Sequence, residues 1–347
     1  MKKAHATERM PEGSSPTPGL PATERPSPAQ AASGHDVLLR TSHLSVEFMI
    51  PGGSVRAVND MNIELHKGEV LCLLGESGSG KSAFGNSILR LLPDNGSVTG
   101  HAYFEGREIT EMDERDFRKL RGKEIAAIPQ SAVTSLNPLL RIGTQVDETY
   151  RMHVENDKHA ARENTLRLFK MLGLPRLPDI ANDYPHELSG GMRQRVLVAM
   201  GTAARPKFIV VDEPTKGLDW ARKQGVIDRI GFMQQRYHCG MLLITHDFSF
   251  AESLANNVGI MYAGEIVECG DAETVLKRAC HPYTTGFIAA QPRNGFHAIK
   301  GFSPSLADMP KGCRFNDRCP QARPSCKRLH PELEEVEPSH FVRCPYA

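Results

Sequence analysis

The chain has 347 residues, enough for one large domain with an appendage, and its charge is balanced, with 42 basic and 41 acidic residues. A balanced charge gives no general attraction to nucleic acid, so no nucleic-acid partner is expected. No apolar run approaches the ~18–20 residues of a membrane span. The basic start, Met1–Lys3, leads into polar residues instead of an apolar signal segment. We therefore expect the chain to be made and kept in the cytoplasm.

The first 36 residues differ in composition from the rest. They are rich in Pro, Ser, Ala, Thr and Glu and contain no aromatic residue, which predicts a disordered tail. Strand-like segments begin at Val37, and Phe48 lies in one of them. An aromatic ring ahead of a nucleotide site could stack on a base, and an ordinary core phenylalanine is the alternative for Phe48.

A phosphate-binding motif, G-x-x-x-x-G-K-S, organises the chain. It follows the apolar run Val70–Leu74 and precedes a helix candidate, Ala83–Leu92, which is the strand–loop–helix context that the motif requires. Backbone N–H groups of the loop and the helix N-terminus would bind phosphate oxygens, the lysine would reach the β- and γ-phosphates, and the last serine would bind Mg²⁺. The eight residues are Gly75, Glu76, Ser77, Gly78, Ser79, Gly80, Lys81 and Ser82.

Polar side chains follow three further apolar runs. Asp212 and Glu213 end one run, His246 follows another, and Gln130 lies just past a shorter third run. Ligands of open parallel sheets bind at the carboxyl ends of the strands. Gln130 is therefore expected near Mg²⁺ and the attacking water, and Asp212 is expected to hold Mg²⁺ indirectly. Glu213 would act as the general base and His246 would contact the γ-phosphate.

Ser189, Gly190 and Gly191 form a favourable helix N-terminus shortly before the run that ends at Asp212. Such a terminus can bind an anion, because its free N–H groups and the helix dipole favour negative charge. A plain helix cap is the alternative for this stretch when it is taken alone.

Four of the eight cysteines fall near the C-terminus, at Cys313, Cys319, Cys326 and Cys344. In a reducing compartment such a cluster predicts metal or iron–sulfur ligation before disulfides. The tight C-x2-4-C pair of structural zinc sites is missing, and the wider spacing favours a [4Fe–4S] cluster over Zn²⁺. Free thiols or a disulfide are the remaining alternatives.

Together these residues resemble the ATP-binding subunit of an ABC transporter from about residue 37 onward. The family's motifs occur in order as Walker A (Gly75–Ser82), Q-loop (Gln130), signature (Leu188–Met192), Walker B (Phe208–Asp212, then Glu213), D-loop (Asp219) and switch (His246). Three further stretches are similar to the dipeptide, oligopeptide and nickel importer group, namely Thr134–Pro138, His281–Thr284 and Gly312–Pro320. Met192 and Lys216 depart from the commoner family pattern, but neither replaces a catalytic group.

The resemblance implies an α/β fold, namely a P-loop NTPase (ABC ATPase) core with a mixed sheet, an antiparallel β subdomain, a helical subdomain and a C-terminal Cys-rich extension. The expected limits are 1–36 for the tail, 37–290 for the ATPase domain, about 131–200 for the helical subdomain and 291–347 for the extension.

The resemblance also implies ATP and Mg²⁺ as cofactors and ATP hydrolysis that energises import of peptides, or of nickel and related solutes. Ser189–Gly191 and Asp219 would contact a nucleotide shared with a second, often non-identical ATPase subunit. The other implied partners are two membrane permease subunits and an extracytoplasmic substrate-binding protein, with this chain bound peripherally at the cytoplasmic face of the inner membrane.

The alternative function is a soluble ABC ATPase of translation or DNA repair. Such proteins usually carry two cassettes in one chain, or long coiled-coil or zinc-hook insertions, and neither feature is present here. A P-loop kinase outside the ABC family would not need the Leu188–Gly191 motif.

Overall fold

The computed structural model describes residues 37–216 and 220–347, without the side chains of residues 132–133 and 220–222. The predicted tail and Asp219 lie outside the described residues. The described residues from 37 to 347 belong to one compact unit. The predicted limit between 290 and 291 therefore stays a prediction.

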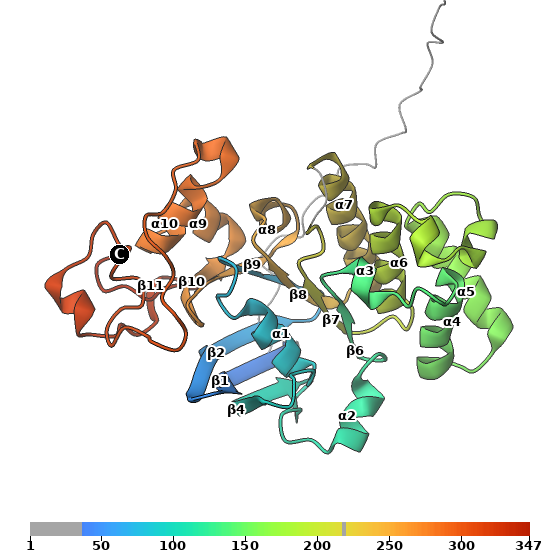
Figure 1. The fold of residues 1–347 in the computed structure, drawn as a ribbon, viewed down its shortest axis with the longest axis horizontal. Coiled ribbons are helices and arrows are strands. Elements are labelled where there is room, and N and C mark those ends of the chain that lie inside the picture. The colour runs from blue at the N-terminus through green and yellow to red at the C-terminus, as the bar shows by residue number, and fades with distance from the viewer. Residues whose placement is uncertain (1–36, 217–219) are drawn as a thin grey trace, which may run out of the picture. The chain divides into compact units, whose positions relative to one another are not determined.

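A mixed eight-stranded sheet forms the centre of the fold (Figure 1). Its strand order is β11-β12-β10-β9-β3-β8-β7-β6, and the strands from β9 to β6 are parallel, whereas β10, β12 and β11 pair antiparallel. The strands are β3 (Val70–Leu74), β6 (Ile125–Ile128), β7 (Phe208–Asp212), β8 (Gly240–Thr245), β9 (Asn257–Tyr262), β10 (Glu265–Asp271), β11 (Glu334–Glu337) and β12 (His340–Val342).

A second sheet of four antiparallel strands has the order β2-β1-β4-β5. Its strands are β1 (Val37–Ile50), β2 (Gly53–His66), β4 (Gly96–Phe104) and β5 (Arg107–Glu108). The hairpin between β1 and β2 turns at Pro51 and Gly52, where the sequence predicts a turn. The mixed sheet and the separate antiparallel sheet confirm the predicted fold class.

Two hydrophobic cores cover the two faces of the central sheet. Because side chains alternate along a strand, Cys72 and Leu74 of β3 join one core with the helices, whereas Leu71 and Leu73 join the other core with β1 and β2. All five residues of β3 are buried, as expected of a parallel strand covered on both faces. This double burial explains why the segment before the phosphate loop is a continuous apolar run.

The helices α3 to α6 gather beyond the β6 edge of the sheet (Figure 1). They span residues 132–202, and the limits of the helical subdomain, about 131–200, stay a prediction. The helices are α1 (Lys81–Ile88), α2 (Glu114–Leu120), α3 (Ala132–Ser135), α4 (Ile142–His153), α5 (Lys158–Met171), α6 (Gly190–Thr202), α7 (Trp220–Tyr237), α8 (Phe248–Leu254), α9 (Ala272–Lys277) and α10 (Pro282–Ala289), with short 3₁₀ turns η2 (Asp179–Asn182), η3 (Pro185–Glu187), η4 (Pro292–Asn294) and η5 (Pro324–Lys327).

The C-terminal extension packs onto the β10 end of the central sheet. Strand β12 pairs with β10 through Glu268 and Cys269. Phe315 is buried and makes edge contacts with the rings of Tyr262 and Tyr283. The extension is therefore anchored on the same sheet that carries the phosphate loop. Within the described residues, none of the helices combines the length and the apolar character needed to cross a membrane.

Candidate functional site

The phosphate loop fills the turn between β3 and α1, and its backbone leaves no room for side chains at two glycines. Gly80 caps α1 with φ +101°, and a Cβ there would lie 2.1 Å from the Ala57 carbonyl oxygen. A Cβ at Gly75 would lie 2.2 Å from the Met261 carbonyl oxygen. The loop is thus pressed against β2 and β9, which gives it a fixed shape at the helix N-terminus where anions bind.

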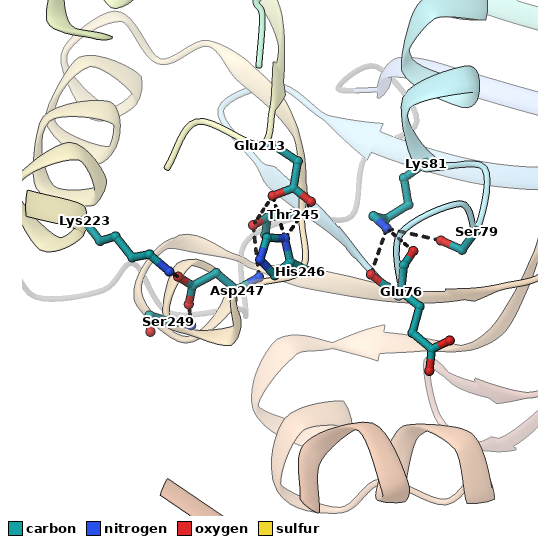
Figure 2. Close-up of polar contacts among 10 residues, drawn as sticks. Glu76, Ser79, Lys81, Glu213, Lys223, Thr245, His246, Asp247 and Ser249 are labelled. Atoms are coloured by element: carbon teal, nitrogen blue, oxygen red, sulfur yellow. Dashed lines mark hydrogen bonds and ion pairs between the residues drawn. The ribbon is translucent and has the colours of Figure 1, made fainter. Parts of the chain in front are cut away.

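Lys81 is buried at the start of α1, with 5% of its surface exposed. Its Nζ donates to the carbonyl oxygens of Gly75 and Glu76 at 2.8 Å each and to Ser79 Oγ at 3.2 Å (Figure 2). Burial lowers the pKa of Lys81, against the raising effect of Glu213 and Asp212. Among the described residues no carboxylate forms an ion pair with this ammonium group, so it can neutralise a phosphate.

Ser82, Gln130 and Asp212 line one cavity of about 290 Å³. The structure therefore brings together the three residues predicted to lie around Mg²⁺, from α1, from the loop after β6 and from the end of β7. Burial raises the pKa of Asp212, while a hydrogen bond with Ser82 works in the opposite direction. Asp212 Oδ1 is buried, and none of the described residues forms a hydrogen bond with it. An unpaired buried carboxylate oxygen beside a hydroxyl and an amide fits the oxygen ligands that Mg²⁺ prefers.

Glu213 and His246 meet at the carboxyl ends of β7 and β8. His246 Nδ1 lies 2.9 and 2.8 Å from the two carboxylate oxygens of Glu213, and Thr245 Oγ1 donates to the same group at 3.4 Å (Figure 2). Glu213 is 8% exposed and has φ +43°, a backbone angle uncommon for a residue with a side chain. Its N–H donates to the Ile244 carbonyl oxygen at 2.8 Å, which holds the turn in place. Residues distant in sequence thus form one polar pair.

Ser189, Gly190 and Gly191 lie elsewhere, at the N-terminus of α6. Ser189 Oγ accepts the Met192 N–H at 3.3 Å, so the serine caps the helix. Ser189 and Gly190 are exposed, and a Cβ at Gly191 would meet no neighbouring atom of the described residues within 4 Å. In the described part of the chain, no hydrogen bond joins this segment to the phosphate loop. The structure therefore does not bring these three residues into the site formed by Lys81, Asp212 and Glu213.

Phe48 is half-buried near the end of β1 and packs against the core between the two sheets. Its ring approaches Gly96 of the paired strand β4. This is the packing of an ordinary core phenylalanine, the alternative stated above, and stacking on a base stays a prediction.

Sequence patterns gave no indication of a group of contacts at Glu76. Arg318, Ser303 and Tyr283, all from the C-terminal part of the chain, contact this residue of the phosphate loop. Arg318 is separated from Glu76 by 242 positions and belongs to no periodic pattern. Only its place beside Cys319, in a segment singled out for its cysteines, could have drawn attention to it.

The four C-terminal cysteines are free thiols, each partly exposed. Burial raises the pKa of Cys313 to about 11, and Cys326, Cys344 and Cys319 raise it further when they are ionised. The Cys313 N–H also donates to the Cys326 carbonyl oxygen at 2.8 Å. The residues that sequence analysis grouped are thus grouped in the structure.

Two family models match the chain. One, described as ABC transporter, matches residues 58–216, and the other, described as oligopeptide/dipeptide transporter C-terminal region, matches residues 267–326. The oligopeptide transport ATP-binding protein OppD of Escherichia coli is 39% identical over 314 residues, which cover 89% of this chain and 93% of OppD. The dipeptide transport ATP-binding protein DppD of Bacillus subtilis is 35% identical over 314 residues, 88% of this chain and 94% of DppD.

A solved structure of similar fold is MJ0796, a dimeric bacterial ABC transporter cassette. It superposes with a TM-score of 0.61 and 24% identity, covering 68% of this chain and 99% of MJ0796. At that identity the likeness shows the fold alone, and the family rests on the relatives and the two matched regions. The chain therefore belongs to the ABC transporter family, as an ATP-binding subunit that carries the oligopeptide/dipeptide transporter C-terminal region.

Proposed function

We propose that this ATPase energises the import of peptides through a membrane ABC transporter. The observation that carries the proposal is the convergence of Lys81, the Ser82–Asp212 cavity and the Glu213–His246 pair at the carboxyl edge of one sheet. Peptides are the proposed cargo because OppD and DppD are named for oligopeptide and dipeptide transport. Nickel and related solutes are the second candidate cargo, from the subgroup that the motifs resemble.

Each residue takes a role that its surroundings allow. The backbone of Gly75–Gly80 and the Lys81 ammonium would bind the phosphates of ATP. Ser82 and Gln130, with Asp212 acting indirectly, would hold Mg²⁺, which would supply neutralisation of phosphate charge. Glu213 is held at the end of β7, where it orients the attacking water and accepts its proton. His246 steadies the γ-phosphate while its Nδ1 stays beside Glu213. Phe48 is the proposed contact for the base.

The signature residues complete a different nucleotide site. Ser189 and Gly190 are exposed, Gly191 is partly exposed, and in the described part of the chain no hydrogen bond joins them to the phosphate loop. We therefore propose that they bind the γ-phosphate of the ATP held by a second ATPase subunit and that Asp219 contacts the same nucleotide. ATP then favours the closed dimer because its γ-phosphate contacts both subunits only in that state. Two permease subunits, an extracytoplasmic substrate-binding protein and a peripheral place at the cytoplasmic membrane face complete the proposed assembly.

Glu213→Gln tests the catalytic assignment in the assembled transporter. The amide keeps the size of the side chain but cannot accept a proton at neutral pH. We expect hydrolysis to fall by about 10²–10⁴-fold, ATP affinity to stay unchanged and a closed dimer to accumulate on addition of ATP and Mg²⁺. Glu114→Gln, on the exposed surface of α2, is the matched control. Full turnover of Glu213→Gln would refute the role of Glu213 as the base.

We also propose that Cys313, Cys319, Cys326 and Cys344 hold a [4Fe–4S] cluster, with Zn²⁺ as the alternative. Four thiolates in one partly exposed segment suit either group. Tetrahedral zinc with Zn–S bonds of about 2.3 Å needs sulfur atoms about 3.8 Å apart. Among the described residues, no three of these sulfurs lie mutually within 4.8 Å. The wider arrangement favours the larger cluster. Anaerobically purified protein that is colourless and free of iron would count against it.

A further inference from the structure

Glu76, the second residue of the phosphate loop, is held by the C-terminal extension. Arg318 donates from Nη1 and Nη2 to the two carboxylate oxygens of Glu76, each at 3.0 Å, and Ser303 Oγ donates at 2.6 Å. Two parallel N–H···O bonds of this kind fix direction as well as distance. The carboxylate of a loop residue is thus clamped by residues more than two hundred positions away.

Arg318 is itself immobilised, with only 7% of its side chain exposed. Its guanidinium lies over the rings of Tyr262 and Phe315, 5.6 and 5.9 Å from their centroids. Nη1 also donates to the Tyr262 hydroxyl at 3.3 Å, and Nε donates to the Lys300 carbonyl oxygen at 3.2 Å. Because these contacts fix the guanidinium of Arg318, the position of the C-terminal extension determines the position of the Glu76 carboxylate.

The main chain of Glu76 connects this clamp to the nucleotide site. Its N–H donates to the Tyr283 hydroxyl at 3.1 Å, and its carbonyl oxygen accepts from Lys81 Nζ at 2.8 Å. Figure 2 shows the carboxylate of Glu76 pointing away from the Lys81 ammonium, so the residue spans two environments. The contacts of the Glu76 side chain with the extension therefore orient the Glu76 carbonyl group, which accepts a hydrogen bond from Lys81.

We infer that Arg318 is a positioning residue of the ATP site, which ties the first turn of the phosphate loop to the Cys-rich extension through Glu76. The inference deepens the proposed function and rests on it. Without Arg318, the carboxylate of Glu76 would keep only its hydrogen bond from Ser303, and the segment around Glu76 would need further ordering when ATP binds. That ordering costs conformational entropy and lowers affinity.

The place of Arg318 gives the link a second consequence. It lies between Cys313 and Cys319, directly before the latter. A group bound by the cysteines that shifts this segment would change the affinity for ATP, and ATP would change the affinity for that group by the same factor. The extension thereby acts on the nucleotide without touching it.

Arg318→Met tests the link in the full chain, by titration with ATP and Mg²⁺ and by steady-state hydrolysis in the assembled transporter. We expect the ATP dissociation constant and KM to rise about tenfold, with kcat at saturating ATP nearly unchanged. Arg323→Met is the matched control. Arg323 lies in the same segment and stacks on Tyr346 with 3.8 Å to the ring centroid, and among its described contacts none reaches the loop.

A double-mutant cycle separates positioning from general stability. Glu76→Gln should weaken ATP binding in the same direction, and the double variant should bind no worse than Arg318→Met alone, because both changes break one interaction. Equal ATP affinity of Arg318→Met and the unaltered chain would overturn the inference, as would equal losses in Arg318→Met and Arg323→Met. Failure of the unaltered chain to bind ATP would instead overturn the proposed function.

Discussion

The phosphate loop and the segment Ser189–Gly191 are both glycine-containing turns that open a helix, yet their surroundings differ. In the loop, Lys81 is buried and bonded to the loop's own oxygens, and Gly80 touches the backbone of Ala57. At the start of α6, Gly190 is exposed and Gly191 is partly exposed, and no neighbouring atom of the described residues would lie within 4 Å of a Cβ at Gly191. The phosphate loop is thus held by contacts with other parts of the chain, whereas among the described residues the segment Ser189–Gly191 is held only by the Ser189 cap of its own helix.

The contrast shows where the need for each glycine arises. Gly80 is required by the fold, since its φ of +101° and the nearby carbonyl oxygen exclude a Cβ. The fold of the described residues does not require Gly191, because a methyl group there would meet none of their neighbouring atoms within 4 Å. Any requirement for a bare backbone at Gly191 must then come from outside the chain. A phosphate that approaches from a second subunit supplies such a requirement.

Gly80→Ala should have the largest effect, on the fold as well as on binding. The new Cβ would lie 2.1 Å from the Ala57 carbonyl oxygen in a left-handed backbone conformation. Such overpacking and strain destabilise by about 3 kcal/mol, so both the melting temperature and ATP affinity should fall. Thermal unfolding with and without ATP measures the two effects. A normal melting temperature would show that the loop is not pressed against β2 as described.

Gly191→Ala should spare the fold and lower hydrolysis. Alanine inside a helix is more favourable than glycine by about 1 kcal/mol, so the melting temperature should not fall. A methyl group beside the N–H groups that meet the partner's γ-phosphate should lower turnover of the assembled transporter by about 10²-fold. ATP affinity of the isolated chain should stay the same. Undiminished turnover would refute the proposal that a bare backbone at Gly191 is needed to bind the γ-phosphate of the partner's ATP.

Elements formed by neighbouring residues could be predicted, as could the meeting of residues that end parallel strands, whereas the contacts made by the packing of the C-terminal extension could not. The strand–loop–helix around Gly75–Ser82 is visible in sequence because apolar runs and glycines specify it locally. The meeting of Glu213 and His246 also follows, since parallel strands end at one edge. The Arg318–Glu76 pair depends on how the extension packs over Tyr262 and Phe315, which no spacing or periodicity encodes.

Protonation of Asp212 in the Ser82–Asp212 cavity should have the smallest effect on stability and on ATP affinity. Its pH dependence distinguishes this cavity from the segment Ser189–Gly191, which should not contribute to it. Burial raises the pKa of Asp212, so the carboxyl binds a proton at a higher pH than an ordinary aspartate. Because the folded state then binds more protons than the unfolded state, the free chain gains stability from Asp212 as pH falls through this range.

Binding of Mg²⁺ with ATP should move in the opposite direction, since the cation and the proton compete for the same carboxylate. We expect affinity to fall by up to about tenfold per pH unit on the acid side. Titration of the chain with ATP and Mg²⁺ at several pH values measures this slope. Asp212→Asn should abolish the slope, whereas Gly191→Ala should keep it. An unchanged slope in Asp212→Asn would place the competing proton on another group.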